Sequence, residues 1–343
     1  MPLNQPPVAA GTGWLAESYD SRDKPYRSQA GGKMEERVNL VEVNPKWLEA
    51  VYDQVDTGSC VANATAAAYR FCAHKINATS QSKVLDDPSR LFIYYNARLL
   101  PALEEAKFTT QSGNTPKTVP FPTGSIDPKG GSENRNSFKG MNIYGVCSEK
   151  TWPWENVEVE VNKNGKKVKK TRPQKLNDCP EDAAYTEAKL ARAVEYCRLD
   201  PDHPDELETN INSEERQAVG VVTLMQVKQC LSEGYPVVFG FWFYWDPLPW
   251  KQYTDTKEWY LDPLPTEMQH NPEQERHGGH TVLIVGYDNK RKQVLVQNSW
   301  GTKATEEGTP RFWMPYNWIT DWECTDDFWM VRLIEEKGGQ KKA

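Results

Sequence analysis

The chain has 343 residues, a formal net charge of −7 and 38% hydrophobic residues, with 13 Trp and 15 Tyr. This length and content of large apolar side chains indicate two lobes or one large folded domain and exclude wholesale disorder, while the negative charge gives no reason to expect nucleic acid as a partner. The seven cysteines form no CxxC or Cys/His metal spacing, so we expect no metal, no cofactor and at least one free thiol.

The N-terminal region carries no recognisable targeting signal. Its first twenty residues have no basic start and no apolar run long enough for a signal peptide. No stretch of the chain approaches membrane-spanning length. We therefore expect a cytoplasmic protein without a membrane partner. Residues 1–45 form an arm rich in Pro, Gly and charge, with a possible strand at Arg37–Val43.

The stretch Val51–Lys75 combines polar residues typical of a catalytic site with the apolar spacing of a buried helix. Cys60 falls in the first turn of that helix, after a tight entry at Gly58 and an expected cap at Ser59. The apolar residues that recur at helical spacing are Ala64, Ala67, Phe71 and Cys72.

Cys60 is the candidate nucleophile. A thiol in the first turn of a helix faces unpaired backbone N–H groups and the positive end of the helix dipole, and both favour the thiolate. A lone cysteine is more often a buried structural residue, so its neighbours must decide between the two interpretations. Gln54 lies six residues before Cys60, where a side-chain amide can donate to an oxygen beside the sulfur.

The following segments alternate helix and loop. Pro88–Leu100 predicts a second helix with an aromatic face, and residues 101–129 have the polar, Pro-rich character of a loop. Gly130 and Gly131 then precede a further helix that ends near Gly145. A glycine pair by itself indicates a plain turn.

Residues 156–216 have the character of an insertion. The sequence VEVEVNKNGKKVKK alternates on both sides of Asn164-Gly165, which predicts a hairpin with a type I′ turn. Its many lysines indicate a solvated hairpin rather than a nuclear address or an anion-binding patch. We expect a helix over Ala183–Cys197 and an acidic linker over Asp200–Glu215.

The C-terminal part predicts mainly strands. A helix over Leu224–Glu233 precedes Pro236–Trp245, which is apolar and aromatic enough for a central strand. The inward aromatics of that strand are core by default, with a substrate pocket as the alternative. Pro247–Glu275 is expected to be a Pro-rich loop, and residues 312–316 and 327–331 are expected to be closing strands.

The segment 280–298 predicts a β-hairpin around the turn-like residues 288–292. We expect the register that pairs Tyr287 with Gln293. In that register Val282 lies opposite Asn298, so the far end of the hairpin brings polar residues of both strands together.

In this register His280 lies opposite Trp300, and side chains two apart share a face, so His280, Asn298 and Trp300 point to the same side. An Asn oxygen can accept from one ring nitrogen of a His and aim the other at a thiol, while a Trp beside them excludes water. A single His is more often a satisfied structural residue. His277, the nearest alternative, turns to the other face.

These motifs resemble those of the papain-like cysteine peptidases. That family carries a Gln, a Gly-Ser-Cys and a long helix at the spacing seen around Cys60, and its His and Asn segments are similar to GGHTVLIVGYD and QNSWGT in the same chain order. The resemblance covers roughly residues 45–155 and 217–340. It implies an α+β fold in which a helical lobe and a β-barrel-like lobe flank the active-site cleft.

The implied boundaries are an arm at 1–45, a helical lobe at 46–155, an inserted hairpin and helix at 156–216, and a β-rich lobe at 217–343. The arm is too short for the usual helical propeptide. The resemblance therefore implies a member made without that inhibitor, or a trimmed chain.

The chain departs from the family pattern at three places. Thr57 and Val61 stand where members commonly carry a Cys and a Trp, so the usual disulfide from that Cys is absent. Ala304-Thr305 stands where a second Trp-Gly often follows, which indicates a changed loop.

The resemblance implies a cysteine-type endopeptidase that acts on peptide or protein substrates. Cys60 would attack a peptide carbonyl to form a thioester, and His280 would act as general acid and base. Asn298 would orient His280, and Gln54 would stabilise the oxyanion together with the Cys60 backbone N–H.

The resemblance also implies substrate contacts. Gly130 and Gly131 would pair with the substrate main chain, since only glycine lets another main chain come so close. A bulky apolar side chain, two residues before the scissile bond, would lie near the Gly279–Thr281 edge and Phe239. Trp300 is grouped with these residues because it lies beside the catalytic pair.

Two other functions stay open. A papain-like fold can serve as a catalytically inactive binding or scaffold module, and the departures from the family pattern leave room for this. The same thioester can also be used for acyl transfer or peptide ligation, which the sequence does not distinguish from hydrolysis.

Overall fold

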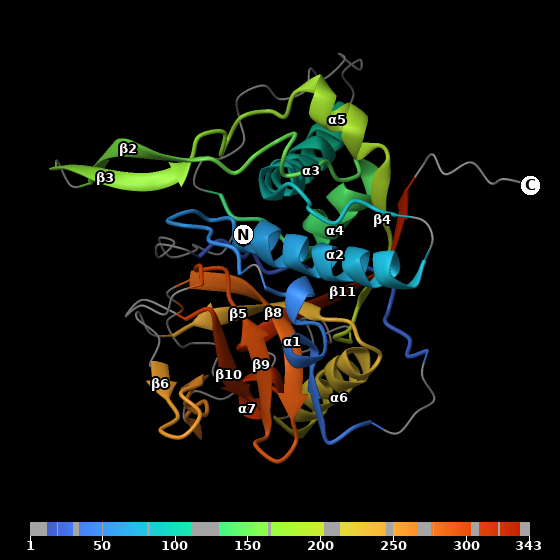
Figure 1. The fold of residues 1–343 in the computed structure, drawn as a ribbon, viewed down its shortest axis with the longest axis vertical. Helices are drawn as coiled ribbons and strands as arrows, with labels where there is room; N and C mark the ends of the chain where they lie inside the picture. Colours follow the sequence, from blue (N-terminus) through green and yellow to red (C-terminus); the bar gives the residue numbers. More distant parts are fainter. Residues whose placement is uncertain are drawn as a thin grey trace, which may run out of the picture.

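The computed structural model describes residues 12–18, 20–29, 34–49, 51–80, 83–111, 130–163, 166–201, 213–244, 250–266, 276, 278–302, 309–321 and 323–336. In Figure 1, α3 (Arg90–Gln111), α4 (Asn134–Ile143) and α5 (Asp182–Ala188) lie in one half of the molecule. Most of the large sheet lies in the other half, together with α6 (Ser213–Ser232), and α2 (Cys60–Thr79) runs between the halves. The α+β fold expected from the sequence is confirmed.

The main sheet contains nine strands among the described residues, and its central strands are almost continuously buried. All pairings are antiparallel except that of β10 with β7. The order is β4 (Ala191–Arg198), β11 (Thr325–Glu336), β5 (Val237–Phe243), β8 (Gly278–Asp288), β9 (Gln293–Gln297), β10 (Arg311–Pro315), β7 (Trp259–Leu261) and β6 (Trp250–Gln252), with β1 (Arg37–Asn39) pairing with the far end of β8.

The helix α2 is the shared wall of the two halves. It packs on β8 and β11 on the sheet side and on α3 on the helical side. Its residues 60–69 and 71–73 are buried, so the amphipathic face expected from the sequence extends nearly around the helix. The other helices are α1 (Leu40–Val43), the 3-10 turn η1 (Pro45–Trp47), α3 (Arg90–Gln111), α4 (Asn134–Ile143), α5 (Asp182–Ala188), α6 (Ser213–Ser232) and α7 (Tyr316–Ile319).

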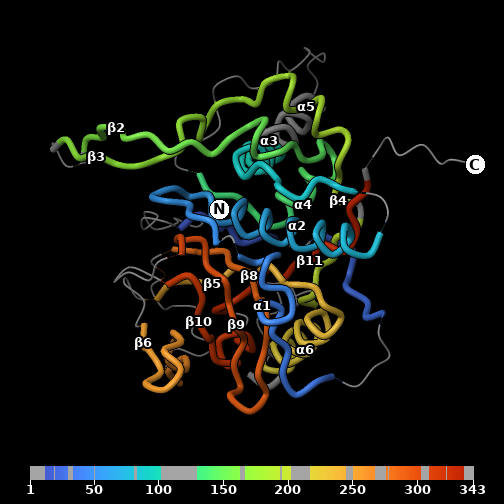
Figure 2. Tube along the Cα trace, in the orientation of Figure 1, coloured from blue at the N-terminus to red at the C-terminus, as the bar shows by residue number. Residues whose placement is uncertain are grey.

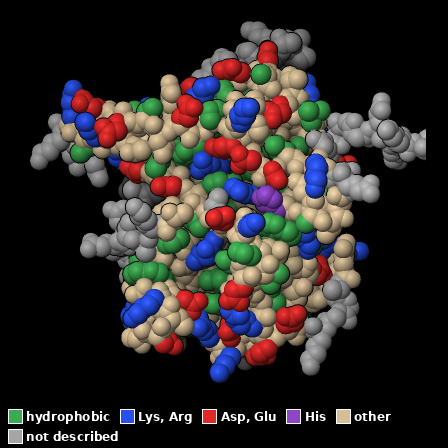
Figure 3. Space-filling model, in the orientation of Figure 1, with side chains coloured by type: hydrophobic (Ala, Val, Ile, Leu, Met, Phe, Trp, Pro, Cys, Tyr) green, Lys and Arg blue, Asp and Glu red, His purple; other side chains and the backbone are tan. Residues whose placement is uncertain are grey.

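The hairpin predicted near residue 160 is confirmed as β2 (Asn156–Lys163) and β3 (Lys166–Pro173), which project from the helical half (Figure 2). Its turn, Asn164-Gly165, lies outside the described residues. Acidic and basic side chains alternate over this end of the molecule (Figure 3), and Lys169 pairs with Glu158 at 3.2 Å.

The helix expected over Ala183–Cys197 is wrong in its second half. α5 ends at Ala188, and residues 191–198 form β4, which pairs with β11 at the edge of the main sheet. Ala191 and Ala193 are buried while Arg192 is partly exposed, which is the two-residue period of a strand. The predicted helix was therefore extended past its real end at Ala188.

Four other boundaries differ from the predictions. The loop expected from residue 101 is helical as far as Gln111, because good helix formers follow Pro101, and residues 112–129 lie outside the described chain. The acidic linker ends before Ser213, where α6 already begins.

The Pro-rich loop after residue 247 contains β6 and β7. The possible strand in the arm becomes β1 and then α1, because the Asn39 side chain accepts from two backbone N–H groups and caps the helix.

The predicted register of the β8–β9 hairpin is right at one end and wrong at the other. Leu283 pairs with Gln297 as expected, but Tyr287 pairs with Val294 instead of Gln293. The register shifts between Ile284 and Gly286, so β8 carries one extra residue there. The shift lies beyond Ile284, so the His280 end of the hairpin keeps the expected alignment.

All seven cysteines are free thiols, which agrees with the expectation of at least one free thiol. Among the described residues, no helix combines the length and the apolar character needed to cross a membrane.

Candidate active site

Cys60 begins α2 and is completely buried. Backbone N–H groups of Thr281, Val61 and Gly13 surround its thiol and act on its pKa. Ser59 occupies the cap position, but its side chain makes no capping hydrogen bond. Asn63 instead donates to the Ser59 carbonyl and hydroxyl oxygens, both at 3.0 Å, so the helix start is fixed from within the helix.

His280 and Asn298 meet as the strand spacing predicts, with His280 Nε2 2.8 Å from Asn298 Oδ1. Asn298 Oδ1 also accepts the Ser299 N–H at 2.8 Å, which identifies it as the carbonyl oxygen and Nε2 as the donor. The Trp300 ring stacks on the imidazole at 4.9 Å. Neutral His280 then carries its lone pair on Nδ1, which is buried without a hydrogen-bond partner among the described residues.

Gln54 is buried between the two segments that carry the catalytic candidates. Its backbone N–H donates to the Ser299 carbonyl at 2.8 Å, and its Oε1 accepts the Ser299 hydroxyl at 2.6 Å. Its Nε2 donates to the Thr57 carbonyl at 2.8 Å. These bonds tie the loop before Cys60 to the residue after Asn298, so Gln54 holds the two sides of the site in register.

The arm lies across the nucleophile. Gly13 and Trp14 donate their N–H groups to the Gly279 carbonyl at 3.0 and 3.1 Å. On the opposite side Ser132 donates to the Gly13 carbonyl at 2.8 Å, and Leu15 donates to the Ser132 carbonyl at 3.1 Å. The extended main chain of the arm is therefore hydrogen-bonded on both sides, to Gly279 and to Ser132.

The close main-chain approach expected at the glycine pair is made by this arm. A Cβ added at Gly131 would lie inside contact distance of the Gly13 carbonyl, and one added at Gly13 would collide with the Gly58 carbonyl. The main chains at Gly13, Gly58 and Gly131 therefore approach so closely that only glycine fits. Gly130 accepts the Tyr94 hydroxyl at 2.7 Å through its carbonyl and so anchors this wall to α3.

The Trp14 side chain fills the space next to Cys60. It packs with Cys60 and Val61 in a buried apolar cluster, and its ring centroid lies 4.7 Å from that of Trp242. Its Nε1 donates to Asp327 Oδ2 at 2.9 Å. Sequence reasoning missed both residues, since a lone Trp in a Pro-rich arm and an Asp inside a strand carry no periodic signal.

The residues expected to line the substrate pocket lie in different places. Gly279 faces Trp14, and Thr281 donates its hydroxyl to Asn134 Oδ1 at 3.0 Å. Phe239 is fully buried and stacks on Phe328 at 5.1 Å, because alternate residues of β5 point to opposite faces.

Burial makes both catalytic candidates neutral in this arrangement. Desolvation raises the pKa of the Cys60 thiol to about 11, against the opposing effect of the surrounding backbone N–H groups. Desolvation also lowers the pKa of His280 to about 4, with the Asn298 hydrogen bond acting in the opposite direction. The thiolate–imidazolium pair implied by the family resemblance is therefore disfavoured while the arm excludes water.

A buried cluster of charged side chains fastens the arm beyond Trp14. Glu17 accepts from the Arg135 backbone N–H and, at 3.2 Å, from Trp329 Nε1. Arg135 also binds Asp23, at 2.6 Å. Burial raises the pKa of Glu17 to about 8, against the opposing effect of the nearby guanidinium groups of Arg135 and Arg198.

Arg198 holds the other end of this cluster. Its Nη2 lies 2.6 Å from Asp200, 3.1 Å from Asp326 and 3.3 Å from Asp327. The three carboxylates come within 4.8 Å of one another, so a guanidinium already occupies the place where their charges converge.

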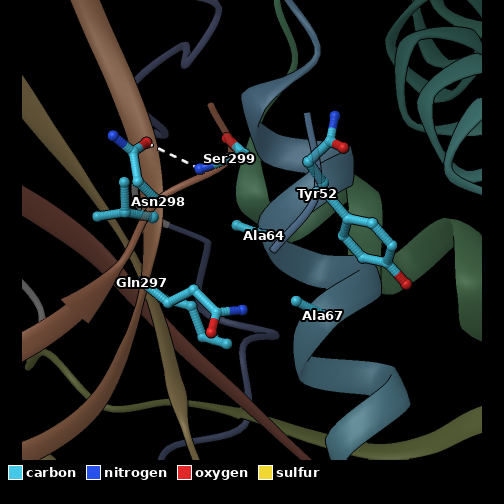
Figure 4. Close-up of a pocket in the computed structure, with 9 residues that line it drawn as sticks. Tyr52, Ala64, Ala67, Gln297, Asn298 and Ser299 are labelled. Atoms are coloured by element: carbon cyan, nitrogen blue, oxygen red, sulfur yellow. Dashed lines mark hydrogen bonds between the residues drawn. The ribbon is translucent and has the colours of Figure 1, made fainter. Parts of the chain in front are cut away.

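A small cavity of about 10 Å³ lies between α2 and the end of β9, where Ala64 and Ala67 face Gln297 and Asn298 (Figure 4). Asn298 Nδ2 has no hydrogen-bond partner among the described residues. The space is about that of one water molecule, so it is too small for a substrate side chain.

Comparisons with known proteins found similar sequences and folds. The model of the Peptidase_C39 like family matches residues 157–318. An uncharacterized peptidase C1-like protein of Acanthamoeba polyphaga mimivirus is 31% identical over 284 residues, which cover 83% of this chain and 70% of the relative.

Two solved structures share the fold. Xylellain, a cysteine protease from Xylella fastidiosa, matches with a TM-score of 0.60 and 27% identity over 96% of this chain and 98% of its own. A procathepsin B from Trypanosoma congolense matches with a TM-score of 0.55 and 15% identity over 94% of this chain and 85% of its own, a likeness of fold alone. The expected two-lobe arrangement is confirmed.

Proposed function

The chain belongs to the papain-like, peptidase C1-like family of cysteine peptidases, and from this premise we propose that it is an endopeptidase that hydrolyses peptide bonds through a thioester on Cys60. The observation that carries the proposal is the His280–Asn298 pair. Its geometry leaves His280 Nδ1 as an unoccupied base, and the Cys60 thiol stands at the start of a helix.

The chemistry follows from these groups. His280 Nδ1 takes the thiol proton, and the Cys60 sulfur attacks the substrate carbonyl carbon. The resulting oxyanion is stabilised by the Cys60 backbone N–H and by the Gln54 amide, as proposed from the sequence. His280 returns the proton to the leaving amine, which breaks the C–N bond. It then activates a water that hydrolyses the thioester, releasing the acid and regenerating the thiol.

We further propose that the arm keeps this enzyme latent. The arm occupies the cleft on both sides of the thiol, and both members of the catalytic pair are held neutral by burial. Hydrolysis therefore requires displacement of residues 12–15. Solvation of the opened site would then lower the pKa of Cys60 and raise that of His280.

Intact-mass labelling with a peptidyl epoxide at about pH 6 tests the function, because ordinary thiols are mostly protonated there. We expect one adduct on Cys60 in the full chain carrying Gly13→Ala, where the added Cβ collides with the Gly58 carbonyl and displaces the arm. The adduct should be lost when His280→Ala or Cys60→Ser is added.

A control variant, Lys24→Ala, alters an exposed arm residue and should label as slowly as the unmodified chain. Absence of an adduct on the folded Gly13→Ala chain, despite an accessible cleft, would favour the inactive binding module. Product analysis with an added amine acceptor separates hydrolysis from acyl transfer.

A further inference from the structure

We propose, on the basis of the proposed peptidase function, that the pocket filled by the Trp14 indole is the specificity pocket of the cleft. We further propose that it selects tryptophan at the substrate residue two before the scissile bond. This differs from the bulky apolar side chain expected from the sequence, because the pocket contains a buried acceptor for a ring N–H.

The arm shows how a main chain lies in this cleft. Residues 13–15 are extended and hydrogen-bonded to Ser132 on one wall and to Gly279 on the other. Pairing on both sides is the way in which enzymes hold an extended peptide. The Trp14 side chain packs against Cys60 and Val61, so the pocket that it fills adjoins the candidate nucleophile.

The shape of the pocket is set by a glycine in an otherwise bulky strand. The strand β5 reads VVFGFWF, and a Cβ added at Gly240 would fall on the indole ring of Trp14. Glycine weakens a strand interior, so its presence at the centre of β5 indicates that something must approach closely there. A Cβ at Gly279 would lie 2.7 Å from the same ring. The two glycines therefore leave room for a flat, two-ring side chain.

The chemistry of the pocket favours an indole over other large side chains. Asp327 is fully buried, and its Oδ2 accepts Trp14 Nε1 at 2.9 Å and the Glu17 N–H at 3.0 Å. Both donors belong to the arm, and displacement of residues 12–15 removes the Trp14 donor. A phenylalanine or leucine in the opened pocket would bury the Asp327 acceptor without a replacement donor, which costs binding energy.

A cationic side chain is disfavoured by the neighbour of Asp327. Arg198 Nη2 already lies 3.3 Å from Asp327 Oδ1 and 2.6 Å from Asp200. A second guanidinium or ammonium group would face this buried cation. The pocket therefore suits a neutral N–H donor on an aromatic ring.

The first test measures kcat/KM of the full chain carrying Gly13→Ala on four peptides that differ only two residues before the scissile bond. We expect tryptophan to exceed phenylalanine, leucine and arginine by about tenfold or more, as for sites built around a buried hydrogen bond. An equal or higher rate with any of the other three overturns the inference and leaves the peptidase function intact. Absence of all hydrolysis counts against the proposed function, and the pocket is then decided by binding.

The binding test needs no catalysis. The full chain carrying Trp14→Ala and Cys60→Ser is titrated calorimetrically with N-acetyl-tryptophan amide and N-acetyl-phenylalanine amide. We expect the tryptophan amide to bind about tenfold more tightly. Adding Gly240→Val should abolish that binding, because the new side chain fills the indole position. Equal affinity for the two amides, or binding that survives Gly240→Val, overturns the inference.

A matched control and a conservative variant sharpen the result. Gly140→Ala adds a Cβ in ordinary contact, 3.5 Å from the nearest atom, and should leave the tryptophan amide affinity unchanged. Asp327→Asn keeps an acceptor oxygen and tolerates the left-handed backbone at φ 58°, so it should retain the preference within about threefold. A reversal toward arginine or phenylalanine peptides in Asp327→Asn overturns the assignment of the acceptor.

Discussion

Trp14 joins two buried polar clusters that use their hydrogen-bonding capacity in different ways. The proposed catalytic residues Cys60, His280 and Asn298 have unused capacity, because His280 Nδ1 and Asn298 Nδ2 have no hydrogen-bond partner among the described residues. In the fastening cluster, Arg135 and Arg198 bind the acidic side chains of Glu17, Asp23, Asp200, Asp326 and Asp327.

The first group of residues is suited to chemical reaction, and the fastening cluster is suited to holding the arm in place. A buried atom without a partner is costly to maintain, and at His280 it would serve as the base of the proposed reaction. Buried charges that are multiply paired are costly to separate, and around Arg198 they hold the arm over the site. Each cluster can be broken independently of the other.

The largest effect is expected from His280→Ala in the chain carrying Gly13→Ala. Loss of the base should lower kcat/KM by about 10⁴-fold, the upper range for general acid–base catalysis. Peptide hydrolysis measures it, with circular dichroism to show that the fold is kept. A rate within tenfold of the parent would remove His280 from the mechanism.

Arg198→Met should break the fastening cluster. Removing the guanidinium leaves buried carboxylates unpaired, and the free energy of unfolding should fall by about 3–5 kcal/mol in urea titrations. Arg37→Ala is the matched control, because its pair with Glu42 is exposed and surface pairs contribute at most about 1 kcal/mol. Equal losses in the two variants would show that the buried cluster does not fasten the structure.

The pH dependence of thiol labelling should distinguish the covered site from the open site. With the arm in place the pKa of Cys60 is about 11, so the iodoacetamide rate should rise about tenfold per pH unit up to that value. In Gly13→Ala the profile should level off at or below the ordinary thiol pKa of about 8.5. Near pH 7 the variant should label at least a hundredfold faster. A fall in the Cys60 pKa from about 11 to about 8.5 by itself raises the thiolate fraction by more than that factor. Coincident profiles would contradict the covering role of the arm.

Gln54→Ala should have the smallest of these effects. If its amide donates to the oxyanion, kcat should fall by about a hundredfold with little change in KM. Because Gln54 also bonds to Ser299 and Thr57, Gln54→Glu serves as the companion variant, which keeps the Ser299 acceptor but loses the amide donor. Full activity in both would assign Gln54 a purely structural role.

The contact between His280 and Asn298 could be predicted from the sequence because it depends on short-range alternation. His280 and Asn298 lie on neighbouring strands of one hairpin, where spacing fixes which side chains meet. The turn-end register was wrong because a single extra residue before Gly286 leaves no mark in an apolar strand.

The position of the arm could not be predicted, because its partners are distant in the sequence. Gly13 and Trp14 meet Gly279 and Asp327 across most of the chain, and no periodic pattern connects them. The strand β4 was missed for a related reason: its pairing partner, β11, lies more than a hundred residues further along the chain. Local helix propensity therefore dominated the interpretation.

The pairing of Asn156 with Pro173 at the base of the projecting hairpin has a consequence for engineering. A hairpin whose first and last residues are paired can be removed or replaced without stretching the flanking chain, since antiparallel partners lie only about 5 Å apart. The hairpin is thus a graft site for a recognition peptide or an affinity handle, in which β3 should keep Lys170 because it pairs with Asp56 in the loop before Cys60.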